Sequence, residues 1–578
     1  MTTGWSRRDF IALVLGAPAA AACRGGGRAR LADGELFSPG KLAGHRALRD
    51  RPPAGAAGQA VRVPDSAWRT VDVVVVGGGA SGLAAGWWLD RRGVRDLAVL
   101  ELDDVVGGTA RSGALDSPIG RFEYPWGAHY IVAPRASQAS LVALLGELGG
   151  LDGATADGEP VVAEALRVRE PEERLYYRGR WYDGLYPAAG ATAADRAELA
   201  AFERAIDGWV GWRDGAGRRA FALPSSAASD DAEVTALDRR SFAAWLDGQG
   251  LRSPRLRWLA DYACRDDYGL TADDTSAWAG VAYFAARRAH PGAEAQGVVT
   301  WPAGNGALIA HLAGRLGDRV RRGHVVVDVR PIAASDGGAG VEVVALGPTG
   351  PVGWRARRAI VATPLHVARH VVAPLRAALA ADAAAPLAAP GHALDRGAWA
   401  VANLHLRDRP RARFGDPPLA WDNVLHDSAS LGYVVATHQT GDGIAGVAQG
   451  RDHGPTVFTW YYPFTGPAAD ARRDLDGASR EDWAGAALAD LARAHPDLPD
   501  LVGRIDVTYW GHGMARPRVG AVFDPALRAL RQPLGPIHLA GTDLSGLALF
   551  EEALDHGVRA ADLVVAALTA PAALTGPT

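Results

Sequence analysis

The chain has 578 residues, 48% of them hydrophobic, and a formal net charge of −4. It is too long for one ordinary domain, and it has enough apolar residues to fill substantial cores. The small net charge gives no reason to expect nucleic acid or an anionic membrane surface as a partner. Cys23 and Cys264 are the only cysteines, which excludes a disulfide framework and a cysteine-based zinc site. Cys264 is expected to be a small buried hydrophobic residue.

The first 23 residues are typical of an export signal. Arg7 and Arg8 belong to a twin-arginine motif, and residues 11–22 form an apolar run. That run is shorter than the about 20 apolar residues that span a bilayer. Cys23 follows three alanines, which fits either a lipoprotein cleavage box or a plain signal-peptidase site. We therefore expect a twin-arginine signal peptide over residues 1–23, a periplasmic or cell-envelope location and, in the first case, a lipid anchor at Cys23.

Residues 71–100 contain the pattern on which the interpretation depends. The apolar run 71–76 is typical of a parallel strand buried on both faces, and a helix-like run begins at residue 83. Between them lies a G-x-G-x-x-G turn that includes Gly77, Gly79, Ala80, Ser81 and Gly82. These glycines allow a tight turn, close approach of a pyrophosphate, and close packing of the helix on the strand. The N-terminus of the helix offers free N–H groups to the phosphates.

An acidic residue completes this pattern. A second apolar strand over residues 97–100 ends at Glu101, about 20 residues after the glycine turn. A carboxylate there accepts hydrogen bonds from both ribose hydroxyls and repels a 2′-phosphate. With a strand before, a helix after and the acid in place, the sequence predicts a dinucleotide-binding site instead of an ordinary glycine-rich turn.

Two further segments, residues 107–112 and 122–130, indicate which dinucleotide is bound. Their key residues are Gly107, Gly108, Thr109, Arg111, Gly127, Ala128 and His129. Together they resemble the flavin amine oxidase superfamily, which includes amine oxidases, phytoene desaturases and protoporphyrinogen oxidases. The resemblance implies FAD as the cofactor, with the glycine doublet after the acidic residue and the Gly-Ala-His segment alongside the flavin ring. Thr109 stands where many members have arginine, and Arg111 is the candidate that replaces it.

The middle of the chain is expected to bind the substrate. Residues 137–300 read as helices and loops rich in aromatic residues, which form either an aromatic-lined pocket or simply a core. Asp266 and Asp267 suggest metal or general-base roles, against the alternatives of a helix cap or an ion pair with Arg265. A predicted strand at residues 431–438 ends in His438, which either faces the flavin or satisfies a buried hydrogen bond.

The C-terminus repeats the resemblance. Gly541 and Asp543 follow a short strand, and a strong helix is predicted over residues 550–567. By the resemblance, Asp543 contacts the ribityl or pyrophosphate portion of FAD, and the helix that begins at Phe550 points at the N1–C2 edge of the flavin. A helix dipole there stabilises the negative charge of the reduced ring. The resemblance also implies that Val329, in a predicted strand, lies on the adenine.

The expected fold is α/β, with a Rossmann-like FAD-binding domain built on a parallel sheet and an inserted α+β substrate domain. The first includes residues 71–136, 301–364 and 508–568, the second residues 137–300 and 365–507, and residues 24–70 are a linker.

The lysine content bears on the type of reaction. Lys41, in the expected linker, is the only lysine. Amine oxidases of the superfamily generally carry a lysine near flavin N5, so its absence favours a dehydrogenase, with a quinone or another electron acceptor, over an oxidase. No cysteine follows Cys264, which indicates non-covalent FAD.

Three functions stay open. In the first, the enzyme transfers a hydride from a C–N or C–C bond of a small or apolar substrate to flavin N5, and Asp266, Asp267 and Asp422 would suit an amine. In the second, it is a carotenoid or porphyrinogen desaturase with an apolar tunnel. In the third, it is a non-catalytic exported electron carrier. The catalytic candidates are His129, Tyr130, Trp510 and His512.

Overall fold

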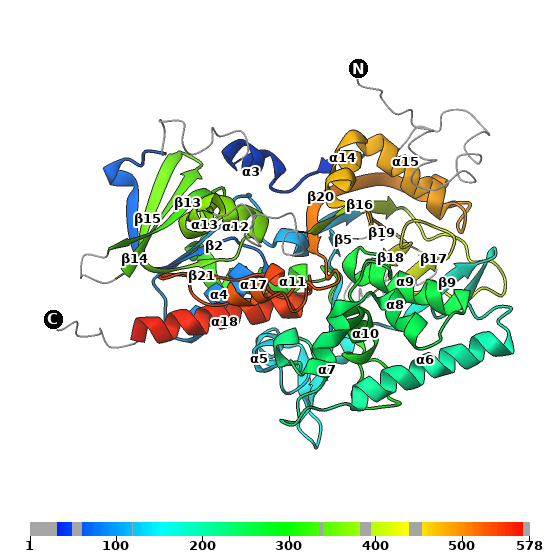
Figure 1. Cartoon of the computed structure of the whole chain (residues 1–578). Coiled ribbons are helices and arrows are strands. Elements are labelled where there is room, and N and C mark those ends of the chain that lie inside the picture. The colour runs from blue at the N-terminus through cyan, green and yellow to red at the C-terminus, as the bar shows by residue number, and fades with distance from the viewer. Residues whose placement is uncertain are drawn as a thin grey trace.

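Two lobes, each built on one large sheet, lie side by side in the computed structural model (Figure 1). The structure describes residues 32–48, 61–117, 120–333, 339–381, 395–438 and 454–569. The expected signal peptide and Cys23 lie outside the described residues. Within them, no helix has both the length and the apolar character that a membrane crossing needs.

The first lobe contains a seven-stranded sheet with the order β12-β3-β2-β15-β14-β13, and β21 also pairs with β15. Strands β12, β3, β2, β15 and β21 run parallel, whereas β13 and β14 are antiparallel. The bounds are β2 (Trp68–Val76), β3 (Leu97–Leu100), β12 (Val320–Arg321), β13 (Val325–Ala333), β14 (Ala339–Gly347), β15 (Gly350–Val361) and β21 (Ile537–Leu539). The last four residues of β2 are buried valines, as a strand covered on both faces requires.

Helices cover both faces of this sheet. One group shares a core with it: α4 (Ala80–Arg91), α5 (Ala139–Glu147), α11 (Gly306–Leu316) and α18 (Phe550–Thr569). The other group is α12 (Leu365–Val371), α13 (Ala373–Ala381) and α17 (Pro525–Ala529). The assignment of α5, α12 and α13 to the substrate domain is therefore wrong, because their apolar faces pack on the first sheet. The predicted helix at residues 550–567 is confirmed.

The second lobe contains an eight-stranded sheet with the order β1-β20-β16-β19-β18-β17-β9-β10. The bounds are β1 (Leu36–Phe37), β9 (Glu173–Tyr177), β10 (Arg180–Asp183), β16 (Arg396–Leu406), β17 (Asp422–Leu425), β18 (Tyr433–Val435), β19 (Thr456–Pro463) and β20 (Val502–Ala515). The boundary expected at residue 508 falls inside β20 and is wrong, because β20 pairs with β16 along most of its length, with register shifts at two points. The strand predicted at 431–438 shortens to β18.

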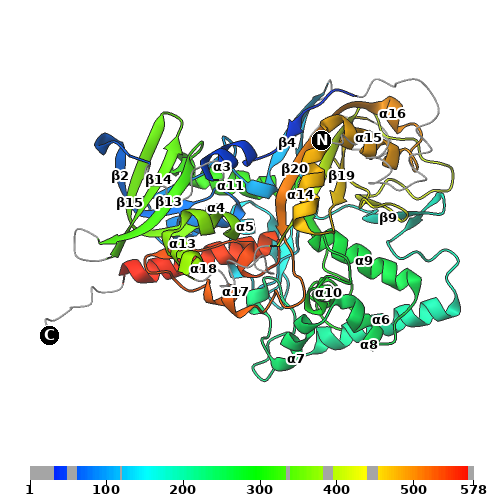
Figure 2. The same cartoon turned by 45° about the horizontal axis from the view of Figure 1, so that its top comes forward.

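Helices also flank the second sheet (Figure 2). Helices α14 (Ala468–Gly477), α15 (Arg480–Leu491) and α16 (Leu498–Leu501) share a core with one face. The other face is approached by a helical cluster: α6 (Ala193–Gly211), α7 (Ala232–Thr235), α8 (Phe242–Gly248), α9 (Pro254–Tyr268) and α10 (Ala277–Ala285). Cys264 is buried in this cluster, which confirms its predicted role.

Short hairpins and strand pairs complete the chain. They are β4 (Ser112–Ser117) with β5 (Gly120–Pro125), β6 (Tyr130–Val132) with β11 (Val298–Thr300), and β7 (Leu151–Ala154) with β8 (Pro160–Val162).

The expected linker contains folded structure. Strand β1 pairs with β20, and helix α3 (Lys41–Leu48) follows it. Ala47 is buried against Val327 and Val344, and residues 61 and 63 pack beside them. The linker prediction is wrong for residues 36–48 and 61–70. Their Gly, Pro and Arg content is typical of a linker, but apolar side chains among them pack against the first sheet. Lys41 is thus part of a folded element.

Candidate functional site

The glycine turn has the geometry that its spacing predicts. Gly77 has a φ of +106°, a region that favours glycine. Gly79 is the N-cap of α4, and a Cβ there would meet nothing within 4 Å. A Cβ on Gly82 would lie 1.9 Å from the carbonyl oxygen of Gly77, so only glycine lets α4 approach the strand this closely. The positively polarised end of α4 therefore opens onto free space.

A second glycine loop faces the first. Gly107 and Gly108 have φ values of +113° and +56°. The N–H of Gly107 donates to the carbonyl oxygen of Gly78 at 2.8 Å, and a Cβ on Gly108 would lie 3.6 Å from the Cα of Gly79. The two loops hold each other in place through backbone contacts that larger residues would obstruct.

Glu101 lies at the end of β3, where the sequence places it. Its carboxylate accepts hydrogen bonds from the N–H groups of Gly78 at 2.8 Å and Asp103 at 2.9 Å. Burial raises the pKa of Glu101, and these two hydrogen bonds and the charge of Arg111 oppose that rise. The carboxylate is thus fixed beside the glycine turn.

A cavity of about 1050 Å³ connects these features. It lies at the carboxyl ends of the parallel strands, where ligands bind in open α/β sheets. Most of the predicted site residues line it: Gly77, Gly79, Ala80, Ser81, Glu101, Gly107, Gly108, Thr109, Arg111, Trp510, His512, Gly541 and Asp543. Gly82 packs behind the turn, in its predicted role.

The cavity fits a dinucleotide. Four buried polar atoms without a hydrogen-bond partner belong to residues that line it: Ser81 Oγ, Arg111 Nε, Thr363 Oγ1 and His366 Nδ1. Buried polar groups are nearly always hydrogen-bonded, so unpartnered ones in a ligand cavity indicate a polar ligand. The phosphates and hydroxyls of FAD supply such partners.

Asp543 is held mainly by protein groups. One carboxylate oxygen accepts from the N–H of Leu365 at 2.7 Å, and the other forms an ion pair with Arg396. Arg396 lines the cavity and also donates to the carbonyl oxygen of His512 at 3.0 Å. Sequence reasoning missed Arg396, because nothing nearby in the chain marks it.

Two stacked histidines form another part of the wall. The rings of His366 and His512 lie 4.1 Å apart at 18°. Burial and the charges of Arg472, Arg396 and His45 lower the pKa of His512 to about 3, so the ring is neutral at pH 7. His366 was also missed, although its position just after β15 is where a parallel sheet presents ligand-binding residues.

Six predicted cofactor-binding or catalytic residues do not line the cavity: Gly127, Ala128, His129, Tyr130, Val329 and Phe550. Val329 is fully buried in the core beneath α12 and α13, and Val325 and Val326, at the start of β13, line the cavity instead. Phe550 and Ala128 pack in or against the core around α4 and α18. The contact of Val329 with the adenine, which the resemblance implies through the backbone of this residue, stays a prediction.

Gly127, His129 and Tyr130 belong to an aromatic cluster next to the cavity. A Cβ on Gly127 would lie 3.8 Å from Nε1 of Trp510, which lines the cavity. The hydroxyl of Tyr461 donates to the carbonyl oxygen of Gly127 at 2.8 Å, and the His129 ring lies 5.8 Å from the Tyr461 ring. Burial lowers the pKa of His129 to about 3. His129 is thus a neutral ring packed among aromatic side chains.

Asp267 has a structural partner. Its two carboxylate oxygens accept from Arg287 at 3.0 and 2.7 Å. Asp267 thus pairs with Arg287 and not with Arg265, whose charge acts on Asp266. The Arg287 guanidinium also lies 4.4 Å from the ring of Tyr283 and 6.0 Å from that of Tyr130.

Asp266, Asp422 and Glu173 form an acidic group around this ion pair. Burial and the charge of Asp267 raise the pKa of Asp266, and burial and the charge of Asp266 raise that of Asp422. Burial and the charge of Glu172 raise the pKa of Glu173 to about 7. Asp422 accepts a hydrogen bond from Tyr262 at 3.1 Å. Asp266 and Asp422 are only half-buried, and their charges also act on Tyr461. The group therefore adjoins the aromatic cluster.

His438 has a packing role. Its Nε2 lies 2.6 Å from the carbonyl oxygen of Arg169, which agrees with the second of the two alternatives, a buried hydrogen bond.

The parallel sheet, the two glycine loops and Glu101 define a dinucleotide-binding α/β protein with a separate substrate lobe. The chain belongs to the family of flavin-containing amine oxidoreductases, whose model matches residues 80–565. This family implies a flavin cofactor, FAD. Among curated proteins, none matches the sequence.

Solved structures share the fold at low identity. Wild-type putrescine oxidase, in a structure with bound putrescine, is 19% identical, with a TM-score of 0.56 over 86% of this chain and 100% of that one. Cyclohexylamine oxidase from Brevibacterium oxydans IH-35A is 18% identical, with a TM-score of 0.56 over the same shares. A protein named as a protoporphyrinogen oxidase from Exiguobacterium sp. 255-15 is 16% identical, with a TM-score of 0.55 over 86% of this chain and 98% of that one. These likenesses confirm the expected α/β fold with FAD-binding and substrate domains.

Proposed function

We propose that this protein is an FAD-dependent oxidoreductase that oxidises a cationic amine. The observation that carries the proposal is the acidic group of Asp266, Asp422 and Glu173 beside the aromatic cluster. Arg287 is already bound to Asp267, so a further cation beside the other carboxyls would lower their raised pKa values and favour their ionised forms. The ammonium group of an amine supplies it. A polyisoprenoid, which needs an apolar tunnel, does not fit these carboxylates.

The residues of the cluster have distinct tasks. Bound FAD would accept a hydride from the substrate carbon next to nitrogen. An ammonium group must first lose a proton to free its nitrogen lone pair. Asp266, whose pKa is raised to about 7 and which lies near Asp422, is suited to receive that proton near neutral pH. The faces of Tyr461 and Trp421 can hold the cation through cation–π contacts.

Anaerobic reduction of the bound flavin tests this proposal. Amines should bleach the flavin, whereas alkenes of similar size should not. Asp422→Asn should slow reduction by amines about 100-fold, the lower range for loss of an acid–base group. The matched control is Asp116→Asn, in an exposed ion pair on β4. Bleaching by alkenes alone would support a desaturase, and no bleaching by either class would support an electron carrier.

The position of the single lysine bears on which compound accepts the electrons. Lys41 is the only lysine in the chain, and it lies at the outer wall of the cavity beside α14. We infer that oxygen is a poor acceptor and that a quinone or similar compound takes the electrons. After anaerobic reduction, mixing with quinone should reoxidise the flavin faster than mixing with air. Faster reoxidation by air would identify an oxidase.

The cofactor linkage and location are proposals from the sequence. We infer that FAD is held non-covalently, so acid should release all the flavin from the precipitated protein.

We also infer twin-arginine export to the periplasm or cell envelope, with or without a lipid on Cys23. Changing Arg7 and Arg8 to lysine should retain flavin-loaded protein in the cytoplasm, and unchanged export would contradict the signal.

A further inference from the structure

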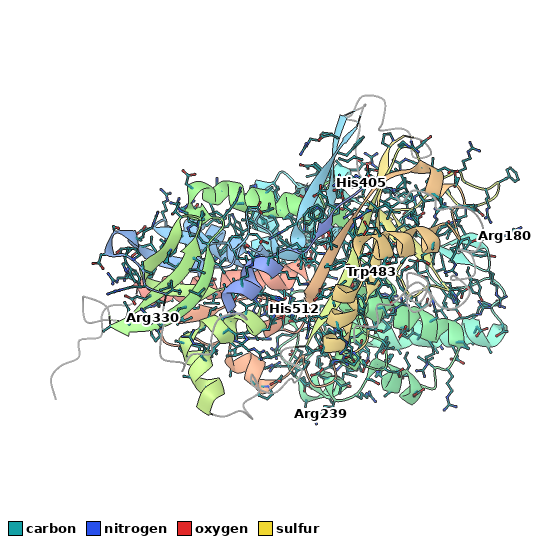
Figure 3. The ribbon with its side chains drawn as sticks, turned by 90° about the horizontal axis from the view of Figure 1, so that it is seen from above. Arg180, Arg239, Arg330, His405, Trp483 and His512 are labelled. Atoms are coloured by element: carbon teal, nitrogen blue, oxygen red, sulfur yellow. The ribbon has the colours of Figure 1, made fainter. Side chains whose placement is uncertain are left out.

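Residues 36–48, here called the N-terminal arm, lie before the family-matched region that begins at residue 80. The arm consists of β1, a turn and α3. Figure 3 shows α3, in blue, between the first sheet and β20, next to the labelled His512. The charge of His45, in α3, helps to lower the pKa of His512. The arm therefore lies at the cavity and not in a detached tether.

The arm forms one wall of the cavity. Pro39, Gly40, Lys41, Gly44 and His45 line the same space as the two glycine loops. A Cβ on Gly40 would lie 3.4 Å from Cδ1 of Leu102, next to the predicted ribose-binding carboxylate. A ligand that binds the glycine loops thus has the arm on its outer side.

The arm is anchored on both lobes. At its start, the ring of Phe37 lies 4.6 Å from that of Trp126, and β1 pairs with β20. Lys41 Nζ lies 2.5 Å from Oδ1 of Asp476, on α14. At its end, Ala47 is buried against Val327 in the first sheet. These contacts make the arm a bridge across the cavity between the two lobes.

The charge of this wall suits an anionic cofactor. Lys41 and His45 face the cavity from the arm, and Arg472 faces it from α14. A lysine ammonium is a common partner of phosphate groups, and the pyrophosphate of FAD is expected at the N-terminus of α4. The ion pair with Asp476 is partly exposed, so it holds the arm only modestly by itself. A bound cofactor would add contacts from inside.

We propose that the N-terminal arm is part of the FAD-binding site and closes the cavity over the cofactor, with Lys41 as its latch to α14. The arm and FAD then stabilise each other, because each binds more tightly when the other is in place. This proposal rests on the flavin cofactor but not on the substrate, so failure of the amine proposal leaves it intact.

The first test measures FAD release from the holoprotein by the gain of flavin fluorescence after dilution. Lys41→Glu places a carboxylate against Asp476, whereas the matched control Lys41→Arg keeps the ion pair. We expect FAD release from Lys41→Glu to be at least about tenfold faster than from the control, the effect of about 1.4 kcal/mol. Equal release rates in two folded variants would overturn the proposal.

The second test uses the wild-type holoprotein and its single lysine. Endoproteinase Lys-C cuts after lysine, so its one target in the chain is the bond after Lys41. We expect added FAD to slow the cut, and the cut protein to lose FAD faster than the uncut Lys41→Arg control under the same treatment. A cutting rate that is the same at every FAD concentration, or unchanged retention of FAD after the cut, would overturn the proposal.

Discussion

The phosphate end of the cavity and the acidic group near the substrate lobe are built in opposite ways. Around Gly77, Gly79 and Gly107, backbone groups and the absence of side chains shape the cavity. Around Asp266 and Asp422, charged and aromatic side chains from distant segments provide the chemistry. Backbone geometry depends on neighbours in the chain, whereas a side-chain cluster depends on the whole fold. The first should tolerate almost no substitution, and the second should change specificity without loss of the cofactor.

The sharpest test of this contrast is Gly79→Val. The position opens onto the cavity, so the protein should fold, but the new side chain would occupy the space of the pyrophosphate. We expect flavin content to fall to near zero with an intact circular dichroism spectrum. Gly146→Ala, at an open helical position of α5, is the control and should load normally. Normal flavin content in Gly79→Val would disprove the assignment of the turn.

The acidic group should make the free energy of unfolding depend on pH. The pKa of Glu173 is raised to about 7, so the folded protein holds a proton that the unfolded chain releases above about 4.5. Its contribution to the free energy of unfolding, about 3 kcal/mol, is present at low pH and is lost as pH rises through 7.

Thermal melts of wild type and Glu173→Gln across pH 4.5–7.5 check this sign. Buried histidines such as His129 have the opposite slope, so the difference between the two proteins is the informative quantity. Relative to Glu173→Gln, the wild type should lose stability as pH rises. A difference that does not depend on pH would show that Glu173 is not buried as a protonated acid.

The smallest expected effect is at Asp543. Asp543→Ala removes the partner of Arg396 at the cavity wall, and FAD binding should weaken by about 1.5–3 kcal/mol, as for a hydrogen bond to a charged group. The choice of substrate should not change. Asp543→Asn keeps an acceptor for the N–H of Leu365 and should lose less. Undiminished FAD affinity in Asp543→Ala would place this turn away from the cofactor.

The local parts of the site could be predicted from sequence. The strand, turn and helix around Gly77 follow from spacing and steric limits within a few residues, and the structure has the predicted geometry there. For Val329, a strand pattern gives the face of the residue but not how far along the strand a ligand lies. Arg396 and His366 line the cavity directly, but they were missed because no motif nearby in the chain marks them and the fold brings them to Asp543 and His512.

The longest-range features were the least predictable. The arm was interpreted as a linker because its composition resembles one, yet β1 pairs with β20, a strand near the other end of the chain. Domain boundaries failed for the same reason at α5, α12, α13 and β20. Helices α5, α12 and α13 pack on the first sheet and β20 pairs with β16 in the second, and these contacts are not visible in composition or periodicity.

Both faces of strand β20 are packed, and this limits the sequence changes that the strand can accept during evolution. Val507 and Tyr509 belong to the core beneath α14 and α15, whereas Trp510 and Met514 pack on the opposite face of the same sheet. Insertion or deletion of one residue would exchange these faces along the strand beyond that point. The irregular pairing between His405 and Leu406 is a place where one extra residue, Gly503, is absorbed. Descendants of this sequence should therefore vary along β20 by substitution, and accept length changes only where its pairing with β16 is already irregular.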